Sequence, residues 1–234
     1  MYIYEEVILM DVISKYIIYF MIYSFVGWSM EVICKLFELK KFVNRGFLIG
    51  PICPIYGYGV LAIVLFIGND TSDILAVFLK SILICSILEY FTSYFMEKLF
   101  KARWWDYSRR KFNINGRICL ETMIPFGILG CVVVYLIHPV IVKFIEFLNP
   151  TFILILSILL FLIYIIDNII SFNVMNKIKN EIKRQKADNT EIIRQKVLEW
   201  IDSNSYLYRH IKNAYPKFKI HEHVGQKLRN DKSI

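Results

Sequence analysis

The stretch PTFILILSILLFLIYIIDNIISF, residues 150–172, has 23 residues and one charged side chain, Asp167. An α-helix rises about 1.5 Å per residue, and the hydrocarbon core of a bilayer is about 30 Å thick. About 20 consecutive apolar residues are therefore enough to cross it. The stretch predicts a transmembrane helix, and the rest of the chain is interpreted outward from it.

Four further apolar runs of similar length precede this one, at about 13–36, 50–68, 74–97 and 118–141. The chain as a whole is 56% hydrophobic, above the roughly 45–50% typical of soluble domains. Its 10 Gly, 6 Pro and 5 Cys residues argue against a collagen, a disordered chain or a disulfide scaffold. We predict an all-α integral membrane protein with about five transmembrane helices within residues 1–172.

Charge is unevenly distributed along the chain. Residues 1–172 carry a net charge of +1, whereas residues 173–234 carry +7 of the total +8. The other basic residues gather in alternate loops, 37–49 and 98–117. By the positive-inside rule this pattern places the N-terminus outside and the C-terminus inside. Beside a membrane domain, a basic tail indicates attraction to anionic lipid rather than to nucleic acid.

Residues 173–234 are interpreted as a basic, amphipathic cytoplasmic tail. Apolar residues recur there at helical spacing between lysines and arginines, namely Ile178, Ile182, Ile192, Ile193, Val197, Trp200 and Ile201. Short helices lying on the inner leaflet are the simpler interpretation, and a tail that binds a partner is the alternative. The triplet His221–Glu222–His223 is too short and isolated to predict a metal site.

Four acidic residues lie within the apolar runs: Glu31, Glu89, Glu121 and Asp167. With the orientation above, all four fall in the cytoplasmic half of the membrane, where a charge is costly to bury. They are candidates for an acidic vestibule that binds a cation or a cationic solute. Local neutralisation is the alternative, because Lys35 follows Glu31 by one turn and Arg117 precedes Glu121 by one turn. Glu89 has no basic residue three or four positions away.

The second run begins with an unusual concentration of glycine and proline. Pro51 and Pro54 remove backbone donors at its start, while nearby glycines permit close backbone approach. This composition favours either a broken, partly re-entrant start or a tightly packed pair of helices. A weak echo recurs 71 positions later, in Asn44/Asn115, Pro54/Pro125 and Gly59/Gly130.

Familiar catalytic motifs are absent from residues 1–234. The sequence contains no G-x-x-x-x-G-K-[ST], no H-E-x-x-H, no G-x-S-x-G and no C-x-x-C. We therefore expect no catalytic residue, no metal and no cofactor, and we do not expect an enzyme.

Two blocks of the sequence carry a resemblance to a known family. The first runs from Phe42 to Gly57, and the second comprises Leu88–Tyr90, Ala102–Tyr107 and Phe112–Ile118. They resemble the bacterial family of ABC-transporter permeases termed CmpB-like or type IV, over roughly residues 16–145. The signature residues, whose roles are unassigned, are Asn44, Arg45, Gly46, Gly50, Pro51, Pro54, Gly57, Arg103, Trp104, Trp105, Asp106, Tyr107, Asn115, Gly116 and Arg117.

The resemblance implies a multi-pass permease subunit of a bacterial cell membrane, energised by a separate cytoplasmic ATPase. The expected partners are the lipid bilayer, that ATPase and a second copy of the chain. The alternative is a non-transporting scaffold, sensor or regulator that binds a partner or anionic lipid through its basic loops and tail. Neither the substrate nor the direction of transport is indicated.

Overall fold

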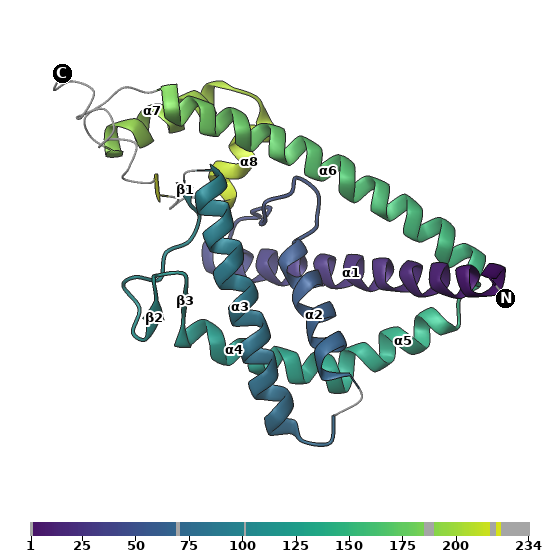
Figure 1. The fold of residues 1–234 in the computed structure, drawn as a ribbon. Coiled ribbons are helices and arrows are strands. Elements are labelled where there is room, and N and C mark those ends of the chain that lie inside the picture. Colours follow the sequence, from purple (N-terminus) through teal and green to yellow (C-terminus); the bar gives the residue numbers. More distant parts are fainter. Residues whose placement is uncertain (1, 69–70, 101, 185–189, 216–218, 221–234) are drawn as a thin grey trace.

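The computed structural model describes residues 2–68, 71–100, 102–184, 190–215 and 219–220. This part of the chain is mostly helical (Figure 1), which confirms the predicted all-α class. The helices are α1 (Tyr2–Leu39), α2 (Pro54–Ile67), α3 (Ile74–Phe100), α4 (Leu120–Val132), a π-helical turn (Val133–Ile137), α5 (His138–Glu146), α6 (Pro150–Arg184), α7 (Thr190–Ser203) and α8 (Tyr206–Ala214). Short strands β1 (Ala102–Arg103) and β4 (Lys219–Ile220) pair antiparallel, as do β2 (Asn113–Ile114) and β3 (Ile118–Cys119). The triplet 221–223 lies outside the described residues.

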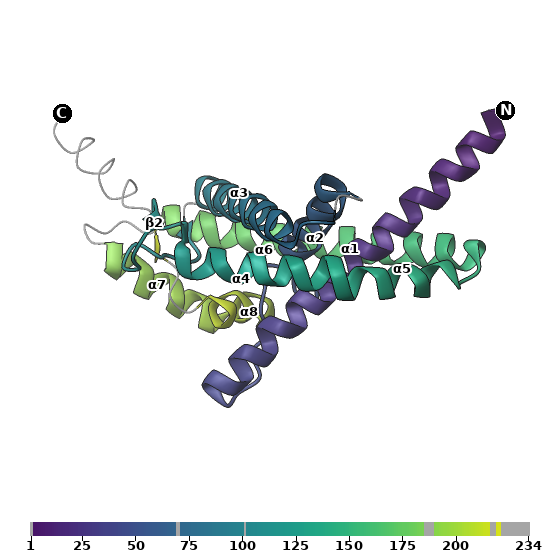
Figure 2. The same cartoon turned by 90° about the horizontal axis from the view of Figure 1, so that it is seen from below.

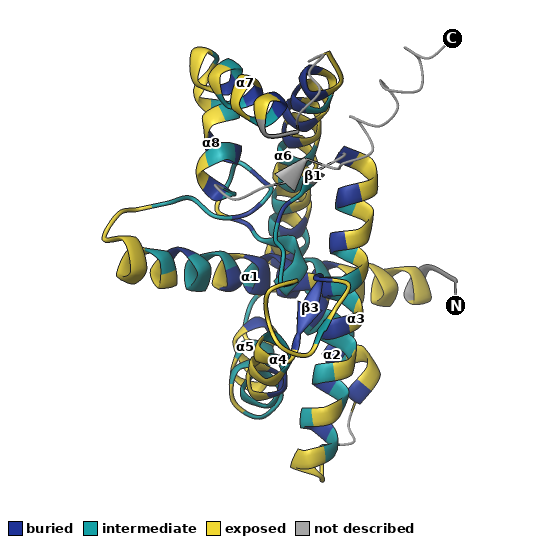
Figure 3. Cartoon of the chain, turned by 90° about the vertical axis from the view of Figure 1, so that its left-hand side faces the viewer, coloured by how far each residue is buried: buried dark blue, intermediate teal, exposed yellow. Residues whose placement is uncertain are grey.

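Four helical segments of the described chain are long and apolar enough to cross a membrane: α1, α3, the continuous stretch Leu120–Glu146, and α6. Within Leu120–Glu146 the π-helical turn directly precedes His138 and Pro139. Proline lacks the N–H that would bond four residues back, and a turn with one extra residue accommodates that loss. Figure 3 shows α3 with buried residues along one side and exposed residues along the other, as expected of a helix that faces lipid.

The second predicted span, 50–68, contains a shorter helix than expected. Helix α2 has 14 residues, which at 1.5 Å per residue is about 21 Å and less than the thickness of a bilayer core. The preceding residues 46–53 are not helical, and Pro54 occupies the first turn of α2, where a missing N–H costs nothing. The start of this run is therefore broken.

Serine and glycine form the closest contacts between the helices. A Cβ atom added to Gly57 of α2 would lie 2.2 Å from the Ser24 Oγ of α1. A Cβ atom on Gly130 of α4 would likewise lie 2.2 Å from the Ser81 Oγ of α3. Small residues allow the close backbone approach that stabilises helix pairs in membranes. Tight packing of α1 on α2 and of α3 on α4 thus accompanies the broken start.

The molecule has two distinct ends (Figure 2). The N-terminal end of α1 and helix α5 lie at one end, and β2 and α7 lie at the other. The segment 40–53 also belongs to the second end, because His210 Nε2 of α8 lies 3.0 Å from its Leu48 carbonyl oxygen. We call this the basic end: residues 40–53, 102–119 and the described residues from 173 onward. The three basic segments therefore lie together.

The apolar faces of the tail pack largely against the chain itself, and their contact with the inner leaflet stays a prediction. They form the tail core, which consists of Phe100, Trp104, Val174, Met175, Ile178, Ile182, Ile193, Val197, Ile201 and Ile211. Ile193, Val197 and Ile201 of α7 recur every fourth residue, and each is at most 1% exposed. Helix α6 and the end of α3 cover most of this narrow apolar stripe, so little of it is left to contact lipid. Helix α6 runs through residue 172 without interruption.

Candidate functional site

Glu31 of α1 has a partner on each carboxylate oxygen. The Tyr56 hydroxyl of α2 donates to Oε1 at 2.7 Å, and Arg45 Nε donates to Oε2 at 3.4 Å. The predicted partner, Lys35, instead forms an ion pair with Glu38. Neutralisation of Glu31 thus comes from the segment after its own helix rather than from the next helical turn.

Glu89 of α3 is the least compensated of the four predicted acids. The residue is 8% exposed, and among the described residues its Oε2 has no hydrogen-bond partner. Its Oε1 accepts one long hydrogen bond, 3.5 Å, from the Tyr107 hydroxyl. Thr122 and Glu31 are further polar neighbours. The structure thus brings Glu31 of α1 and Glu89 of α3 into one neighbourhood.

Asp167 of α6 lies apart from these two and holds the backbone of residues 46–53. Its Oδ1 accepts from the Ile49 N–H at 3.0 Å, and its Oδ2 accepts from the Gly50 N–H at 2.8 Å. The Ser171 hydroxyl donates to Oδ1 at 3.1 Å. A Cβ on Gly50 would lie 2.8 Å from Oδ2, so only glycine fits there without displacement. Asp167 supplies the acceptors that a non-helical segment needs.

Glu121, at the start of α4, is 58% exposed at its side chain and pairs with Arg110 at 2.9 Å. The predicted partner, Arg117, pairs elsewhere. Water screens an ion pair this exposed, so it contributes little to stability. Glu121 is therefore an exposed, paired residue beside the basic end, and its place in a vestibule stays a prediction.

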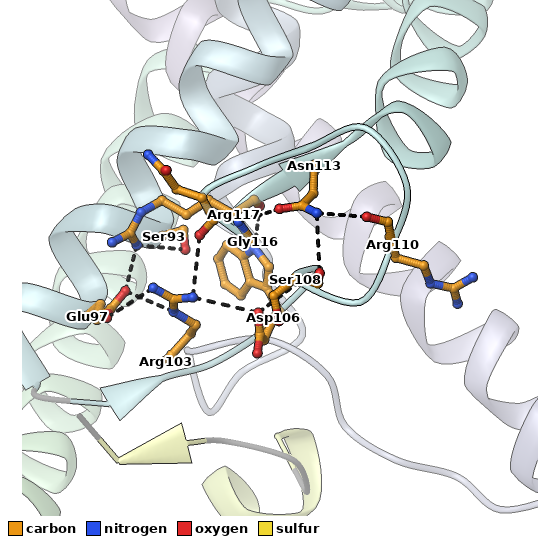
Figure 4. Close-up of polar contacts among 11 residues, drawn as sticks. Ser93, Glu97, Arg103, Asp106, Ser108, Arg110, Asn113, Gly116 and Arg117 are labelled. Carbon is orange, nitrogen blue, oxygen red and sulfur yellow. Dashed lines mark hydrogen bonds and ion pairs between the residues drawn. The ribbon is translucent and has the colours of Figure 1, made fainter. Parts of the chain in front are cut away.

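A buried ion-pair cluster that was not predicted lies at the end of α3 (Figure 4). Glu97 is 5% exposed, and its carboxylate accepts from Arg103 Nε at 3.1 Å and from Arg103 Nη2 at 3.3 Å. Arg117 Nη1 lies 2.7 Å from the same carboxylate and donates to the Ser93 hydroxyl at 3.3 Å. The Arg117 guanidinium also lies over the Tyr94 ring, 5.4 Å from its centroid. We call these residues the Glu97 cluster.

The sequence contains a signal for this cluster. Ser86, Glu89, Ser93 and Glu97 recur at spacings of three or four residues, and all four are buried. A polar stripe at helical spacing faces the protein interior when the rest of the helix faces lipid. Glu97 was missed because it stands at the last position of the predicted run 74–97.

A tight turn places Tyr107 beside Glu89. Asp106 Oδ1 accepts from the Ser108 N–H at 3.0 Å and lies 3.6 Å from Arg103 Nη1. The Asn113 side chain donates to the Arg110 carbonyl at 2.7 Å and accepts from the Gly116 N–H at 3.0 Å. Burial raises the pKa of Tyr107, and the nearby Glu89 carboxylate raises it further, so the hydroxyl remains a donor at neutral pH.

The tail contacts the segment that neutralises Glu31. Arg45 Nη1 donates to the Ala214 carbonyl at the end of α8, and its guanidinium lies 5.7 Å from the centroid of the Tyr215 ring. Asn44 donates to the Ile49 carbonyl at 2.8 Å and accepts from Trp28 Nε1 at 2.6 Å. A single arginine therefore links a membrane acid to the tail.

The family-signature residues supply most of these contacts. In the first block, Asn44 and Arg45 order the segment before α2, and Gly50 and Gly57 pack against Asp167 and α1. In the second block, Arg103 and Arg117 bind Glu97, and Trp105 Nε1 donates to the Arg117 carbonyl at 3.2 Å. Asn115 donates to the Tyr90 hydroxyl at 2.8 Å, and Gly116 has a positive φ of 67°. Their shared role is to position acids and arginines at the basic end.

The site is thus a set of buried acids with arginine and tyrosine partners, in a helical membrane protein. Among the described residues no three His, Cys, Asp or Glu side chains are arranged to hold a metal ion. Residues 18–172 match the family model described as "Putative ABC-transporter type IV" (ABC_trans_CmpB), which is well over half of the chain. The protein therefore belongs to this family, as the two signature blocks predicted. No curated protein and no solved structure matches the chain.

Proposed function

We propose that this protein is the membrane permease subunit of an ABC-type transporter in the bacterial cell membrane, energised by a separate ATPase. Family membership supports a role in transport. Residues 1–234 contain no P-loop, so ATP hydrolysis in the P-loop manner requires another chain. In this proposal the chain crosses the membrane five times, with residues 46–53 and α2 forming the second passage, and the positive-inside rule favours an outside N-terminus and a cytoplasmic basic end.

The observation that carries this proposal is the assembly of the basic end into one structured layer. Arg45 and His210 join the segment 40–53 to α8, and β1 pairs with β4 of the tail. Two loops that follow different membrane helices are therefore mechanically connected. A permease needs such a connection, because force from an ATPase at its cytoplasmic surface must reach several helices together.

The exposed turn 108–112 is the point of that layer best suited to a protein partner. Arg109, Arg110 and Lys111 are all exposed, and Phe112 is 78% exposed with a positive φ of 51°. An aromatic residue held in a strained conformation among basic side chains is typical of a binding site. Glu89, on the route between α1 and α4, would line the pathway.

Purification from native membranes tests the proposal. The tagged protein is isolated in mild detergent, and co-purifying proteins and ATP hydrolysis are measured. A triple variant, R109S/R110S/K111S, removes the charge of the turn, and the matched control K15S/K143S removes basic residues outside the basic end. We expect an ATPase with the wild type and the control, and little with the triple variant.

A wild-type protein that purifies without any ATPase would contradict the proposal. It would favour the alternative, a non-transporting scaffold or regulator, which the same exposed basic turn supports. The Glu89→Gln variant separates the two functions further. A transporter should lose activity while still folding, whereas a scaffold should be indifferent to the loss of a buried charge.

A further inference from the structure

Two buried oxygen atoms without partners lie one turn apart on α3. Ser86 is 5% exposed and Glu89 is 8% exposed, and neither Ser86 Oγ nor Glu89 Oε2 has a hydrogen-bond partner among the described residues. Residues three positions apart on a helix share a face, so Ser86 and Glu89 lie on the same side of α3. Buried polar atoms are almost always satisfied in native proteins, which makes an unsatisfied pair informative.

The net charge around Ser86 and Glu89 follows from the partners of the other acids. Glu31 pairs with Arg45 and accepts a hydrogen bond from Tyr56, and Glu97 pairs with two arginines. Asp167 is committed to backbone N–H groups. Glu89 alone retains an uncompensated carboxylate oxygen, so the site has a formal charge of −1. A single negative charge is matched by one monovalent cation, whereas a divalent cation usually requires more carboxylate ligands.

We propose that Glu89 and Ser86 are ligands of a small monovalent metal cation, Na⁺ or K⁺, bound between α3 and its neighbours. Hard oxygens are available there, since the Tyr107 hydroxyl contacts Glu89 and Thr122 lies beside it, while the Cys85 thiol is a softer neighbour of the same carboxylate. A Cβ on Gly59 of α2 would lie 3.6 Å from Leu88 and 3.8 Å from Cys85, so α2 packs closely beside the site.

The proposal explains how a carboxylate is retained at this depth. A buried charge costs several kcal/mol unless an opposite charge lies against it, and no basic residue of the described chain forms an ion pair with Glu89. A bound cation supplies that charge. The inference deepens the proposed function, in which Glu89 lines the route, but the binding is measured without ATP and without an ATPase.

Thermal unfolding of the full-length protein in nanodiscs tests the inference. At pH 8 and constant ionic strength, choline chloride is replaced stepwise by NaCl or KCl, and the unfolding temperature is recorded. We expect a saturable increase with at least one of the two cations. Glu89→Gln should abolish it, and Ser86→Ala should weaken the apparent affinity about tenfold, as expected for the loss of one neutral ligand.

Two variants serve as matched controls. Glu121→Gln removes the same charge from an exposed position near the inner end of α4, and Ser24→Ala removes a buried, unpartnered hydroxyl on another helix. Both should keep the cation response of the wild type. An unfolding temperature that is the same in choline, Na⁺ and K⁺ would overturn the proposal, as would an equal response in Glu89→Gln. If Glu89→Gln does not fold, an undiminished affinity in Ser86→Ala overturns it instead.

A simply protonated Glu89 gives a distinct result. The wild type would then become more stable as the pH falls, without any dependence on the cation, and the cation site would be rejected. Co-purification with an ATPase is unaffected by that outcome, so failure of the cation site and failure of the proposed function are distinguishable.

Discussion

Helices α1 and α3 each place a glutamate beside a tyrosine, but the two arrangements differ in their arginines. Around Glu31 the Tyr56 hydroxyl lies at 2.7 Å and Arg45 completes the neutralisation. Around Glu89 the Tyr107 hydroxyl lies at 3.5 Å and one carboxylate oxygen has no partner in the described chain. The two arginines available to α3 bind Glu97, eight residues further on.

This difference separates a structural acid from a candidate functional one. Glu31 and Glu97 are held by charged partners that bring loops and helices together, and removing either carboxylate would leave a partly exposed or nearly buried arginine without its partner. Glu89 has no arginine or lysine partner in the described chain, and its hydrogen bond from the Tyr107 hydroxyl is long, at 3.5 Å. Folding therefore does not explain a charged residue at position 89, which is why Glu89 carries the functional proposals.

Replacing Glu97 by Gln should have the largest effect on stability. The change leaves Arg103 and Arg117 without their shared carboxylate, at side-chain exposures of 25% and 11%. Breaking a buried pair by removing one partner costs about 3 kcal/mol. We expect a decrease of that size in the free energy of unfolding, measured by detergent titration. The same change at the exposed Glu121 should cost about 0.5 kcal/mol or less, and equal losses at both positions would mean that the cluster is not buried.

Replacing Gly57 by Ala should have the second largest effect, because it separates α1 from α2 and withdraws Tyr56 from Glu31. The added Cβ would lie 2.2 Å from Ser24 Oγ and 2.7 Å from a Phe20 ring carbon. Overpacking of this kind costs about 2 kcal/mol. The unfolding free energy is again the measurement. Gly68→Ala is the control without crowding, since no atom lies within 4 Å of a Cβ added there. Gly68 has a positive φ of 57°, so its own cost reflects backbone strain alone.

Much of the membrane domain follows from the sequence because apolar runs and helix length obey one simple constraint. The runs at 74–97, 118–141 and 150–172 correspond to helices that are each long enough to span. The exception is 50–68, where Pro51 and Pro54 shorten the helix in a way that mean hydropathy does not register. The gathering of the basic loops and tail at one end was likewise expected from the alternation of charge.

The site was harder to predict, because its pairs join residues far apart in the sequence. Glu31 finds Arg45 fourteen positions away, and Asp167 binds backbone groups of residues 49 and 50. Helical spacing suggested Lys35 and Arg117 as partners, and both pair elsewhere. The echo at 71 positions does not mark equivalent roles either, since Pro54 begins α2 whereas Pro125 lies inside α4.

Replacing Arg45 by Gln should leave Glu31, like Glu89, with one carboxylate oxygen that has no charged partner. Glu31 would keep only the Tyr56 hydroxyl, and α8 would lose its contact from Arg45 to the Ala214 carbonyl. We expect a loss of about 1.5 kcal/mol in unfolding free energy, because Arg45 is partly exposed. A second cation-dependent increase in the unfolding temperature should appear. Arg110→Gln, which breaks an exposed pair, should show neither effect, and a cation response there would make the comparison uninformative.

The smallest predicted effect is a pH dependence at the contact between α8 and the segment before α2. Burial lowers the pKa of His210, although Leu48, Asp167 and Gly46 partly oppose the shift. The folded protein therefore favours neutral His210, whose Nε2 lies 3.0 Å from the Leu48 carbonyl oxygen. The unfolded chain takes up the proton first, so stability is complete above about pH 6.5 and falls as the pH decreases toward the lower pKa of the folded state. The loss cannot exceed about 1.4 kcal/mol per pH unit, because one proton is involved.

His210→Gln retains a donor for Leu48 without titrating, and the difference in stability between wild type and variant isolates this group from other histidines. A difference that stays constant between pH 7 and pH 5 would show that this contact between the tail and the membrane domain does not respond to protons.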